Sequence, residues 1–369
     1  MKKSDRAKRI FIAATMQNDG KTTVSLGLIF ALKKRFGRIG FIKPVGQRYL
    51  LENGYKVDED SVLIERVFGF KGKIKDMNPI AVEKGFTEKY ILKGRVDSLE
   101  RQILYSFNTI SRDNDLVVIE GTGHAGVGSC FDLSNARVAK LLDAQVILIS
   151  SGGIGKPIDE ILLNKALFEK EGVKILGVVI NKVLEDKYDK VQRLVKRGLK
   201  KNGIELLGVV PYKGILIYPT IRQIGEELNL KFLSQSHGLG NMVKKILVGA
   251  MEPHEALNYF GDGCLIITPG DREDIILSAM SFHLTVKGKN ARIAGIILTG
   301  NILPHKSIIE LIHLAKIPVL IAKQDTYSIA SRVHDLTVKI RPEDRHKIRE
   351  VAGLVENYID IPKIIASLT

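Results

Sequence analysis

The 369-residue sequence has no tryptophan, only two cysteines, and 6% aromatic residues. Cys130 and Cys264 lie far apart and lack metal-ligand spacing, so we expect reduced thiols and neither a zinc site nor a disulfide framework. The scarcity of aromatic rings argues against a platform that stacks the bases of single-stranded nucleic acid. No apolar run approaches the roughly 20 residues needed to cross a membrane, and the basic start leads into a strand and not a cleavable apolar segment. We therefore expect a cytoplasmic chain without a membrane partner.

A formal net charge of +15 accompanies 45% hydrophobic and 26% charged residues, the balance of a soluble globular chain of two or three domains. The lysines and arginines are spread through the sequence. Their densest run, 187–201, follows a helical pattern in which a solvated face normally carries charge. Binding to nucleic acid is therefore not expected.

The segment from Arg9 to Leu32 combines a strand, a turn and a helix. An apolar run, 10–14, enters a turn-rich stretch, and Gly20-Lys21-Thr22-Thr23 then opens an apolar-periodic helix. In such a unit the loop N–H groups and the helix N-terminus face a polyphosphate, the lysine neutralises the β- and γ-phosphates, and the next hydroxyl holds Mg²⁺. Gly20, Lys21 and Thr22 are the candidates for these roles.

The match to this phosphate-binding pattern is incomplete at one position. The usual loop has glycine five residues before Gly20, where this chain has Thr15. An ordinary strand-to-helix turn is the alternative interpretation. The strand before the loop and the helix after it favour phosphate binding.

Three further charged residues are candidates because they follow predicted strands or begin a helix. The stretch 38–45 predicts a short strand that ends at Lys43, before a proline, and Glu120 directly follows the apolar run 116–119. Both residues are therefore expected at the carboxyl edge of a sheet, where ligands collect. Glu120 would hold Mg²⁺ directly or through water. Asp60 lies in an acidic segment that is either a metal contact or an ordinary helix cap. Lys43 is alternatively a solvated strand-end lysine.

Strands and helices alternate along the rest of the chain. Helices are predicted over 96–111 and 158–171, and a strand over 174–183 ends near Asn181. This alternation predicts an α/β fold with a doubly wound, mainly parallel sheet. Asn181-Lys182 begins like a guanine-reading element, but its fourth position is Leu184, which disfavours guanine.

A domain boundary is predicted near a proline break at Pro219. Residues 1–218 would form the phosphate-loop domain, and residues 219–369 a linker helix and a smaller α/β domain. Gly270-Asp271-Arg272, Thr299-Gly300-Asn301 and Asp325-Thr326-Tyr327 each follow a predicted strand of the second domain. They would meet at the ligand side of its sheet, although Asp271 and Thr326 fit helix caps equally well.

The first domain resembles the dethiobiotin-synthetase-like branch of phosphate-loop (P-loop) NTPases, most closely the version found ahead of some phosphate acetyltransferases. The motifs that carry this resemblance are ATMQNDGKTT, IKPVGQ, DEDSVLI, VVIEGTG, GVVINKV and LLGVVPY. The resemblance implies Mg-ATP binding and a homodimer with the site close to its interface. It implies that Lys21 and Lys43 act catalytically on the phosphates and substrate. The implied ATP contacts are Asp19, Gly20, Lys21, Thr22, Thr23 and Asn181, and the implied Mg²⁺ contacts are Thr22, Asp60 and Glu120.

The second domain resembles a DRTGG domain, of whose pattern GDRED and LTGN are this chain's versions. Asn301 replaces the last glycine of that pattern. Such domains are linked to regulation and nucleotide sensing. The acyltransferase domain that can follow them is not among these residues, so acetyl transfer by this chain alone is not expected.

Two functions follow from these resemblances. The first is a nucleotide-responsive regulatory protein with weak ATPase activity that acts on its own domains or on a partner metabolic enzyme. The alternative is an ATP-dependent ligase or kinase that activates a carboxylate or carbamate as an acyl phosphate. The bulky polar residues Gln47, Arg48 and His124 in the substrate loops disfavour dethiobiotin synthetase itself. A partitioning role, which usually uses another lysine where this chain has Ala14 and Thr15, is a lesser alternative.

Overall fold

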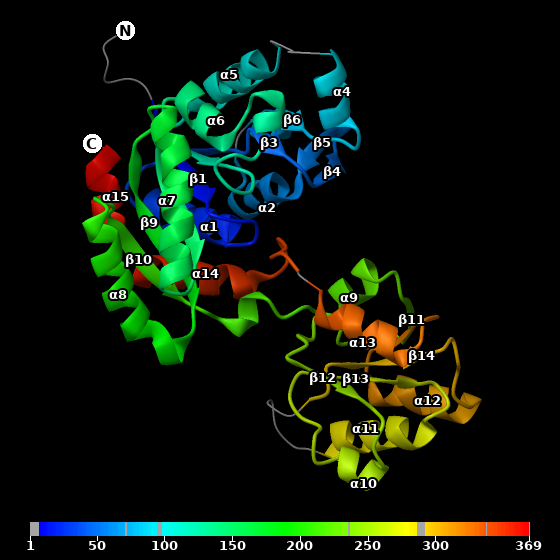
Figure 1. The fold of residues 1–369 in the computed structure, drawn as a ribbon. Helices are drawn as coiled ribbons and strands as arrows, with labels where there is room; N and C mark the ends of the chain where they lie inside the picture. The colour runs from blue at the N-terminus through cyan, green and yellow to red at the C-terminus, as the bar shows by residue number, and fades with distance from the viewer. Residues whose placement is uncertain are drawn as a thin grey trace. The chain divides into compact units, whose positions relative to one another are not determined.

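The structure, a computed structural model, describes residues 7–70, 72–93, 98–234, 237–285, 292–336 and 338–368. The described chain divides into two compact units (Figure 1). The first unit contains the residues up to Lys213 together with those from Ile340 onward, and the second contains Gly214–Lys339. Within the described residues, no helix has the length and apolar character needed to span a bilayer.

The first unit is built on a six-stranded sheet in the order β10-β9-β8-β1-β7-β2, with every neighbouring pair parallel. Its strands are β1 (Lys8–Ala14), β2 (Ile39–Ile42), β7 (Leu116–Glu120), β8 (Gln145–Ser151), β9 (Ile175–Val183) and β10 (Leu206–Pro211). The central strands are apolar and buried almost throughout, as expected where helices cover both faces of a parallel sheet. The predicted fold class, an α/β protein with a doubly wound, mainly parallel sheet, is confirmed.

The helices of this unit lie between these strands or after them along the chain. They are α1 (Lys21–Lys33), α2 (Glu59–Phe68), α3 (Ile74–Met77), α4 (Phe86–Lys93), α5 (Ser98–Ser111), α6 (Asn135–Leu141), α7 (Gly155–Lys170), α8 (Tyr188–Lys201), α14 (Arg345–Tyr358) and α15 (Ile361–Leu368). Two short strand pairs, β3 (Val45–Gly46) with β6 (Ile80–Ala81) and β4 (Tyr49–Glu52) with β5 (Tyr55–Asp58), follow the second strand of the sheet. Short 3-10 helices span Ser129–Phe131 and Glu185–Lys187. The first residues of the helix predicted over 96–111 lie outside the described residues.

The last helices of the chain depart from the predicted division. We predicted one second domain over 219–369, but the residues from Ile340 onward pack with the first unit, where α14 lies against α1 (Figure 1). The buried side of α14 includes Val351 and Val355. Gly27 of α1 admits them closely, since a Cβ at Gly27 would lie 2.2 Å from Val355 Cγ2. An amphipathic helix does not reveal its partner from its own sequence, which is why the prediction was wrong here.

The second unit contains a five-stranded sheet in the order β11-β15-β14-β13-β12, in which only the β11–β15 pair is antiparallel. Its strands are β11 (Lys231–Ser234), β12 (Lys245–Val248), β13 (Cys264–Pro269), β14 (Gly295–Thr299) and β15 (Val319–Ile321). Its helices are α9 (Ile221–Glu227), α10 (Pro253–Ala256), α11 (Glu273–Thr285), α12 (Lys306–Ala315) and α13 (Thr326–His334), with a 3-10 turn at Gly214–Leu216. Two separate apolar clusters pack on the sheet, one containing Ile266 and the other Ile267, which point to opposite faces. This is the smaller α/β domain that the sequence predicted.

Candidate functional site

The predicted phosphate loop runs from the end of β1 to the start of α1. Gly20 is the residue before the helix and has a left-handed conformation with φ of 98°, which glycine adopts without the strain of a side chain. No side chain caps α1, and its first turn contains no acidic residue. The N–H groups of this helix start are therefore available to an external acceptor, and the helix dipole favours an anion there.

Asp19 stabilises the loop from inside. Its Oδ2 accepts hydrogen bonds from Met16 N at 2.7 Å and from Thr15 Oγ1 at 2.9 Å, and its Oδ1 accepts one from Ser151 Oγ at 2.5 Å. The side chain is 4% exposed. The carboxylate of Asp19 thus holds the loop in shape, and any contact that Asp19 makes with a nucleotide is left to its backbone. Thr15, where the usual pattern has glycine, is one of the loop's own hydrogen-bond donors.

Lys21, Thr22 and Glu120 meet at the mouth of the loop. Thr22 Oγ1 donates a hydrogen bond of 2.9 Å to Glu120 Oε1, which joins the start of α1 to the end of β7. Lys21 is buried, and desolvation lowers the pKa of its ammonium group against the attraction of Glu120. Thr23, the next residue, is half-buried in the first turn of the helix. The structure therefore brings together the loop residues and the glutamate that the sequence predicted.

Lys43 lies among three carboxylates at the same sheet edge. Its Nζ forms ion pairs with Asp60 and, at 2.8 Å, with Asp58 Oδ1, and lies 3.9 Å from Glu120 Oε1. Burial opposes the charge on Lys43, but Asp60, Asp58 and Glu120 outweigh it and raise the pKa of Lys43. The ammonium group is therefore fixed as a cation within the protein.

Asp58 holds this cluster in place, and the sequence did not single it out as a site residue. It caps α2 by accepting a hydrogen bond from Asp60 N at 3.0 Å, and it accepts a further bond from Gln47 N at 3.2 Å. Asn78 Oδ1 in turn accepts a bond from Asp58 N at 3.0 Å. Within the acidic segment, the helix cap is Asp58, and Asp60 forms an ion pair with Lys43, so a metal contact of Asp60 stays a prediction. The strand-end position of Lys43 and three successive acids at 58–60 were the only signals of this pairing.

Glu120 is buried in surroundings that would suit a bound cation. Burial, followed by the charge of Asp60, raises the pKa of Glu120 to about 7. Its Oε2 is buried without a partner of normal hydrogen-bond geometry among the described residues, although the Ser25 hydroxyl lies nearby. A buried oxygen without a hydrogen-bond partner normally belongs to a group with a functional role, or binds a water or an ion.

The donor set here fits Mg²⁺ in its usual phosphate-site form. Among the described residues, no group of three or more His, Cys, Asp or Glu side chains is arranged to hold a metal. Mg²⁺ commonly uses only one or two carboxylates and completes its shell with waters and phosphate oxygens. Thr22 and Glu120 match that requirement, while the Asp60 carboxylate is paired with Lys43 in this structure.

Asn181 lies at the end of β9 and contacts the loop directly. Its Nδ2 donates a hydrogen bond of 2.8 Å to the carbonyl of Asp19, and its Oδ1 accepts one of 2.9 Å from Lys182 N. Lys182 Nζ donates to the carbonyl of Asn18 at 2.5 Å. The end of β9 therefore supports the phosphate loop through side chains, and a contact between Asn181 and a base stays a prediction.

Comparison with known families identifies the first unit. A family model described as an AAA domain matches residues 8–220, more than half of the chain. The chain belongs to this AAA domain family. A DRTGG domain model matches residues 223–336, so the chain is a P-loop AAA domain followed by a DRTGG domain, as the two resemblances predicted.

Relatives of this AAA domain protein cover most of the chain. A phosphate acetyltransferase of Pseudomonas putida is 29% identical, over 95% of this chain and 50% of that protein. A phosphate acetyltransferase of a Synechocystis species is 28% identical, over 96% of this chain and 51% of that protein. The chain thus spans about half the length of these curated relatives. Among solved structures, a putative plasmid partition protein of Borrelia burgdorferi bound to AMPPNP covers 57% of this chain and 89% of its own, at 15% identity and a TM-score of 0.40.

Proposed function

We propose that the AAA domain binds Mg-ATP and that the protein is a nucleotide-responsive regulatory protein with weak ATPase activity. The observation that carries this proposal is the uncapped start of α1, with Lys21 buried beside Glu120. Exposed donors, a buried lysine and a carboxylate without a full set of partners form a site that a triphosphate and its metal would complete.

Each candidate residue has a role in this proposal. The N–H groups of Gly20, Lys21, Thr22 and Thr23 would bind phosphate oxygens, and Lys21 would neutralise them. Mg²⁺ would be held by Thr22 and Glu120, with Asp60 contributing through water, and would offset the charge that builds up on the phosphates. Asn181 would keep the loop in place beside the adenine, and the backbone of Asp19 would face the nucleotide.

A regulatory role is supported by the path of the chain. The polypeptide enters the second unit after β10 and returns as α14, which packs against α1, the helix that begins at the phosphate loop. A ligand shifts a conformational equilibrium only by its difference in affinity between the two states. A shift of α1 on nucleotide binding would therefore reach the DRTGG domain through α14. We propose that the protein acts as a cytoplasmic homodimer and that its partner is a metabolic enzyme of the phosphate acetyltransferase kind.

The alternative is a ligase or kinase that forms an acyl phosphate from a carboxylate or carbamate. It would use Lys21, Lys43 and Mg²⁺ for positioning and charge neutralisation. Lys43 is tied to Asp58 and Asp60 in this structure, which favours the regulatory role. ADP release that rises with an added carboxylate, or with a diamine and bicarbonate, would favour the ligase.

Isothermal titration of the purified protein with ATP, with and without Mg²⁺, tests the proposal. Lys21→Ala should abolish binding, since it removes the cation beside the phosphates. Lys196→Ala, which removes an exposed lysine of α8, should bind as the parent does. Cyclic and dinucleotide adenylates test whether the second unit binds a different nucleotide. ATP binding that survives in Lys21→Ala would show that the loop does not bind the phosphates and would refute the site.

A further inference from the structure

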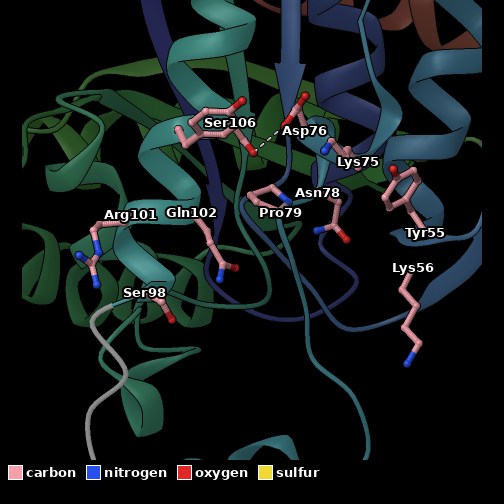
Figure 2. Close-up of a pocket in the computed structure, with 11 residues that line it drawn as sticks. Tyr55, Lys56, Lys75, Asp76, Asn78, Pro79, Ser98, Arg101, Gln102 and Ser106 are labelled. Atoms are coloured by element: carbon pink, nitrogen blue, oxygen red, sulfur yellow. Dashed lines mark hydrogen bonds between the residues drawn. The ribbon is translucent and has the colours of Figure 1, made fainter.

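The first unit contains a cavity that the proposed nucleotide site does not use. It has a volume of about 510 Å³ and lies between β5, α3 and α5 (Figure 2). This volume lies within the range of about 300 to 1,000 Å³ typical of small-molecule sites. The helix α5 borders it with residues three or four positions apart, from Ser98 to Ser106, while Leu99 and Ile103 of the same helix are buried in the core.

The rim of this cavity is basic. Lys56, Lys75 and Arg101 line it, and Figure 2 shows Arg101 and Lys56 on opposite sides of the view. Lys56 Nζ is paired with Glu83 Oε2 at 2.6 Å, and Lys75 Nζ lies 5.6 Å from the centre of the Tyr55 ring. Among the described residues, neither Lys75 nor Arg101 has a carboxylate within salt-bridge distance. Within the part of the chain that the structure describes, two cations at the rim thus lack an anionic partner.

The floor of the cavity is polar and already satisfied. Ser106 Oγ donates a hydrogen bond of 3.0 Å to Asp76 Oδ1, and both side chains are buried. Asp76 is the only carboxylate that lines the cavity among the described residues, so three basic groups face one acid whose charge is partly engaged. The exposed rings of Tyr55 and Tyr105 add flat apolar surface at the rim. This combination suits a small molecule with at least two negative charges, because lysine and arginine pair with carboxylate and phosphate oxygens.

The wall formed by residues 75–79 connects the cavity to the nucleotide site. Asn78 Nδ2 donates a hydrogen bond of 2.8 Å to the carbonyl of Lys43, and its Oδ1 accepts one of 3.0 Å from Asp58 N. Lys43 N donates to the carbonyl of Met77 at 2.8 Å. The segment that a ligand in the cavity would touch is thus the segment that positions Lys43 and Asp58.

We propose that this cavity is an effector site for a small polyanion, bearing phosphate or carboxylate groups, and that its occupancy changes the affinity of the nucleotide site. Binding in the cavity is independent of the proposed nucleotide function, whereas the effector role rests on it. Linkage requires that the anion and Mg-ATP alter each other's affinity by the same factor.

The absence of tryptophan makes a local test available. Tyr105→Trp introduces a single tryptophan at a rim position that is 69% exposed, where a larger ring is tolerated. We would titrate this variant with 2-phosphoglycolate and with citrate, at constant ionic strength, and follow tryptophan emission. A response to 2-phosphoglycolate and not to citrate shows that the site requires a phosphate group, whereas a response to citrate shows that carboxylates are sufficient. Isothermal titration of the parent chain checks that the new ring did not create the site.

Charge-removing variants locate the binding. Arg101→Gln and Lys75→Gln should each lower the affinity for the anion about tenfold, since each removes a charge-assisted contact. Arg112→Gln, which removes an exposed arginine just beyond α5, should leave the affinity unchanged, and so should Lys21→Ala. The proposal is overturned if neither the reporter nor the parent chain responds to the anion at millimolar concentration. It is also overturned if binding is lost only in Lys21→Ala.

The effector role has its own readout. Mg-ATP titrations with and without saturating anion should differ in affinity by about threefold or more, and Arg101→Gln should remove the difference. Equal ATP affinity in both titrations overturns the effector role. If ATP does not bind at all while the reporter still responds to the anion, the nucleotide proposal has failed and the anion-binding site stands.

Discussion

The two units have sheets of similar architecture, but the start of α1 in the first unit differs from the starts of α12 and α13 in the second. In the first unit α1 begins without a side-chain cap. In the second, Asp325 caps α13 by accepting hydrogen bonds from Ser328 N at 2.9 Å and Ser328 Oγ at 2.6 Å. His305 Nδ1 caps α12 by accepting one from Ser307 N at 3.3 Å. The chain thus caps the starts of α12 and α13 with its own side chains, whereas no side chain caps α1.

Buried charge follows the same division. Lys21, Lys43, Asp58, Asp60 and Glu120 are all buried at the edge of the first sheet. Among the described residues of the second unit, every buried polar side chain is uncharged, and the pair Thr299 Oγ1 and Thr326 Oγ1, 2.7 Å apart, lies at the corresponding edge. Buried charges are costly to desolvate and rarely improve stability over apolar packing. Their concentration at one edge of the first sheet therefore agrees with the proposal that this edge binds a charged ligand.

The largest effect on stability is expected from a variant that disrupts the buried charge cluster around Lys43. Lys43→Met leaves Asp58, Asp60 and Glu120 buried without their cation, and should lower the free energy of unfolding by about 3–5 kcal/mol. Urea denaturation measures this difference. Lys34→Met, which removes the lysine of an exposed pair with Glu356, should change stability by about 1 kcal/mol or less. Equal effects of the two substitutions would contradict the distinction between the cluster and the surface.

A second variant breaks the loop without touching a charge. Gly20→Ala places a Cβ in a left-handed conformation and 2.2 Å from Asn181 Nδ2, so either the loop or Asn181 must shift. The affinity for Mg-ATP should fall about tenfold or more, measured by isothermal titration. The matched change in the second unit, Gly240→Ala, meets no atom within 4 Å and should leave ATP affinity and stability as they are. An unchanged affinity in Gly20→Ala would contradict the need for this loop shape.

A smaller effect on stability is expected when the side-chain cap of α13 in the second unit is removed. Asp325→Ala should lower the melting temperature of the second unit without changing ATP affinity, because it removes the cap of α13. The hydrogen bonds from Ser328 lower the pKa of Asp325. The cap therefore stabilises the fold fully at pH values above the ordinary pKa of aspartate, and this stabilisation is lost as the pH falls through the lowered pKa. The difference between parent and variant should therefore shrink on acidification. Glu310→Ala, an exposed change on α12, is the control; a loss of ATP affinity in Asp325→Ala alone would contradict the division of roles.

The smallest perturbation uses the two cysteines as reporters of the two units. Cys130 of the first unit is exposed, whereas Cys264 of the second is buried, and desolvation raises its pKa to about 11. At neutral pH a thiol reagent should label one cysteine per chain quickly and the other only on unfolding. The labelling rate of Cys264 along a urea series then measures the opening of the second unit by itself. Fast labelling of both cysteines in the native protein would contradict this.

The parts of the fold and site that the sequence revealed are those with local signals. The apolar strand before Gly20-Lys21-Thr22 and the periodic helix after it are readable because both are contiguous, and Glu120 is readable because it ends a buried strand. The inward turn of Asp19 onto Ser151, and the bond from Asn181 to the loop, depend on strands that become neighbours only in the folded sheet.

The position of α14 required the same kind of information. Its apolar face is evident from the sequence, but its partner could be any exposed apolar surface. A glycine inside a helical pattern often marks a close contact, and Gly27 is a local signal of this kind. The cavity beside α5 likewise depends on how 74–79 folds against β5, for which the sequence offers no periodic pattern.

The return of the chain to the first unit also has a consequence for synthesis on the ribosome. The residues up to Lys213 emerge first, yet the surface around Gly27 stays uncovered until the whole second unit has been translated. At about 5–20 residues per second, this interval lasts roughly 6 to 25 seconds. The first unit is therefore incomplete during that time, and the second unit has all of its residues before the first unit does.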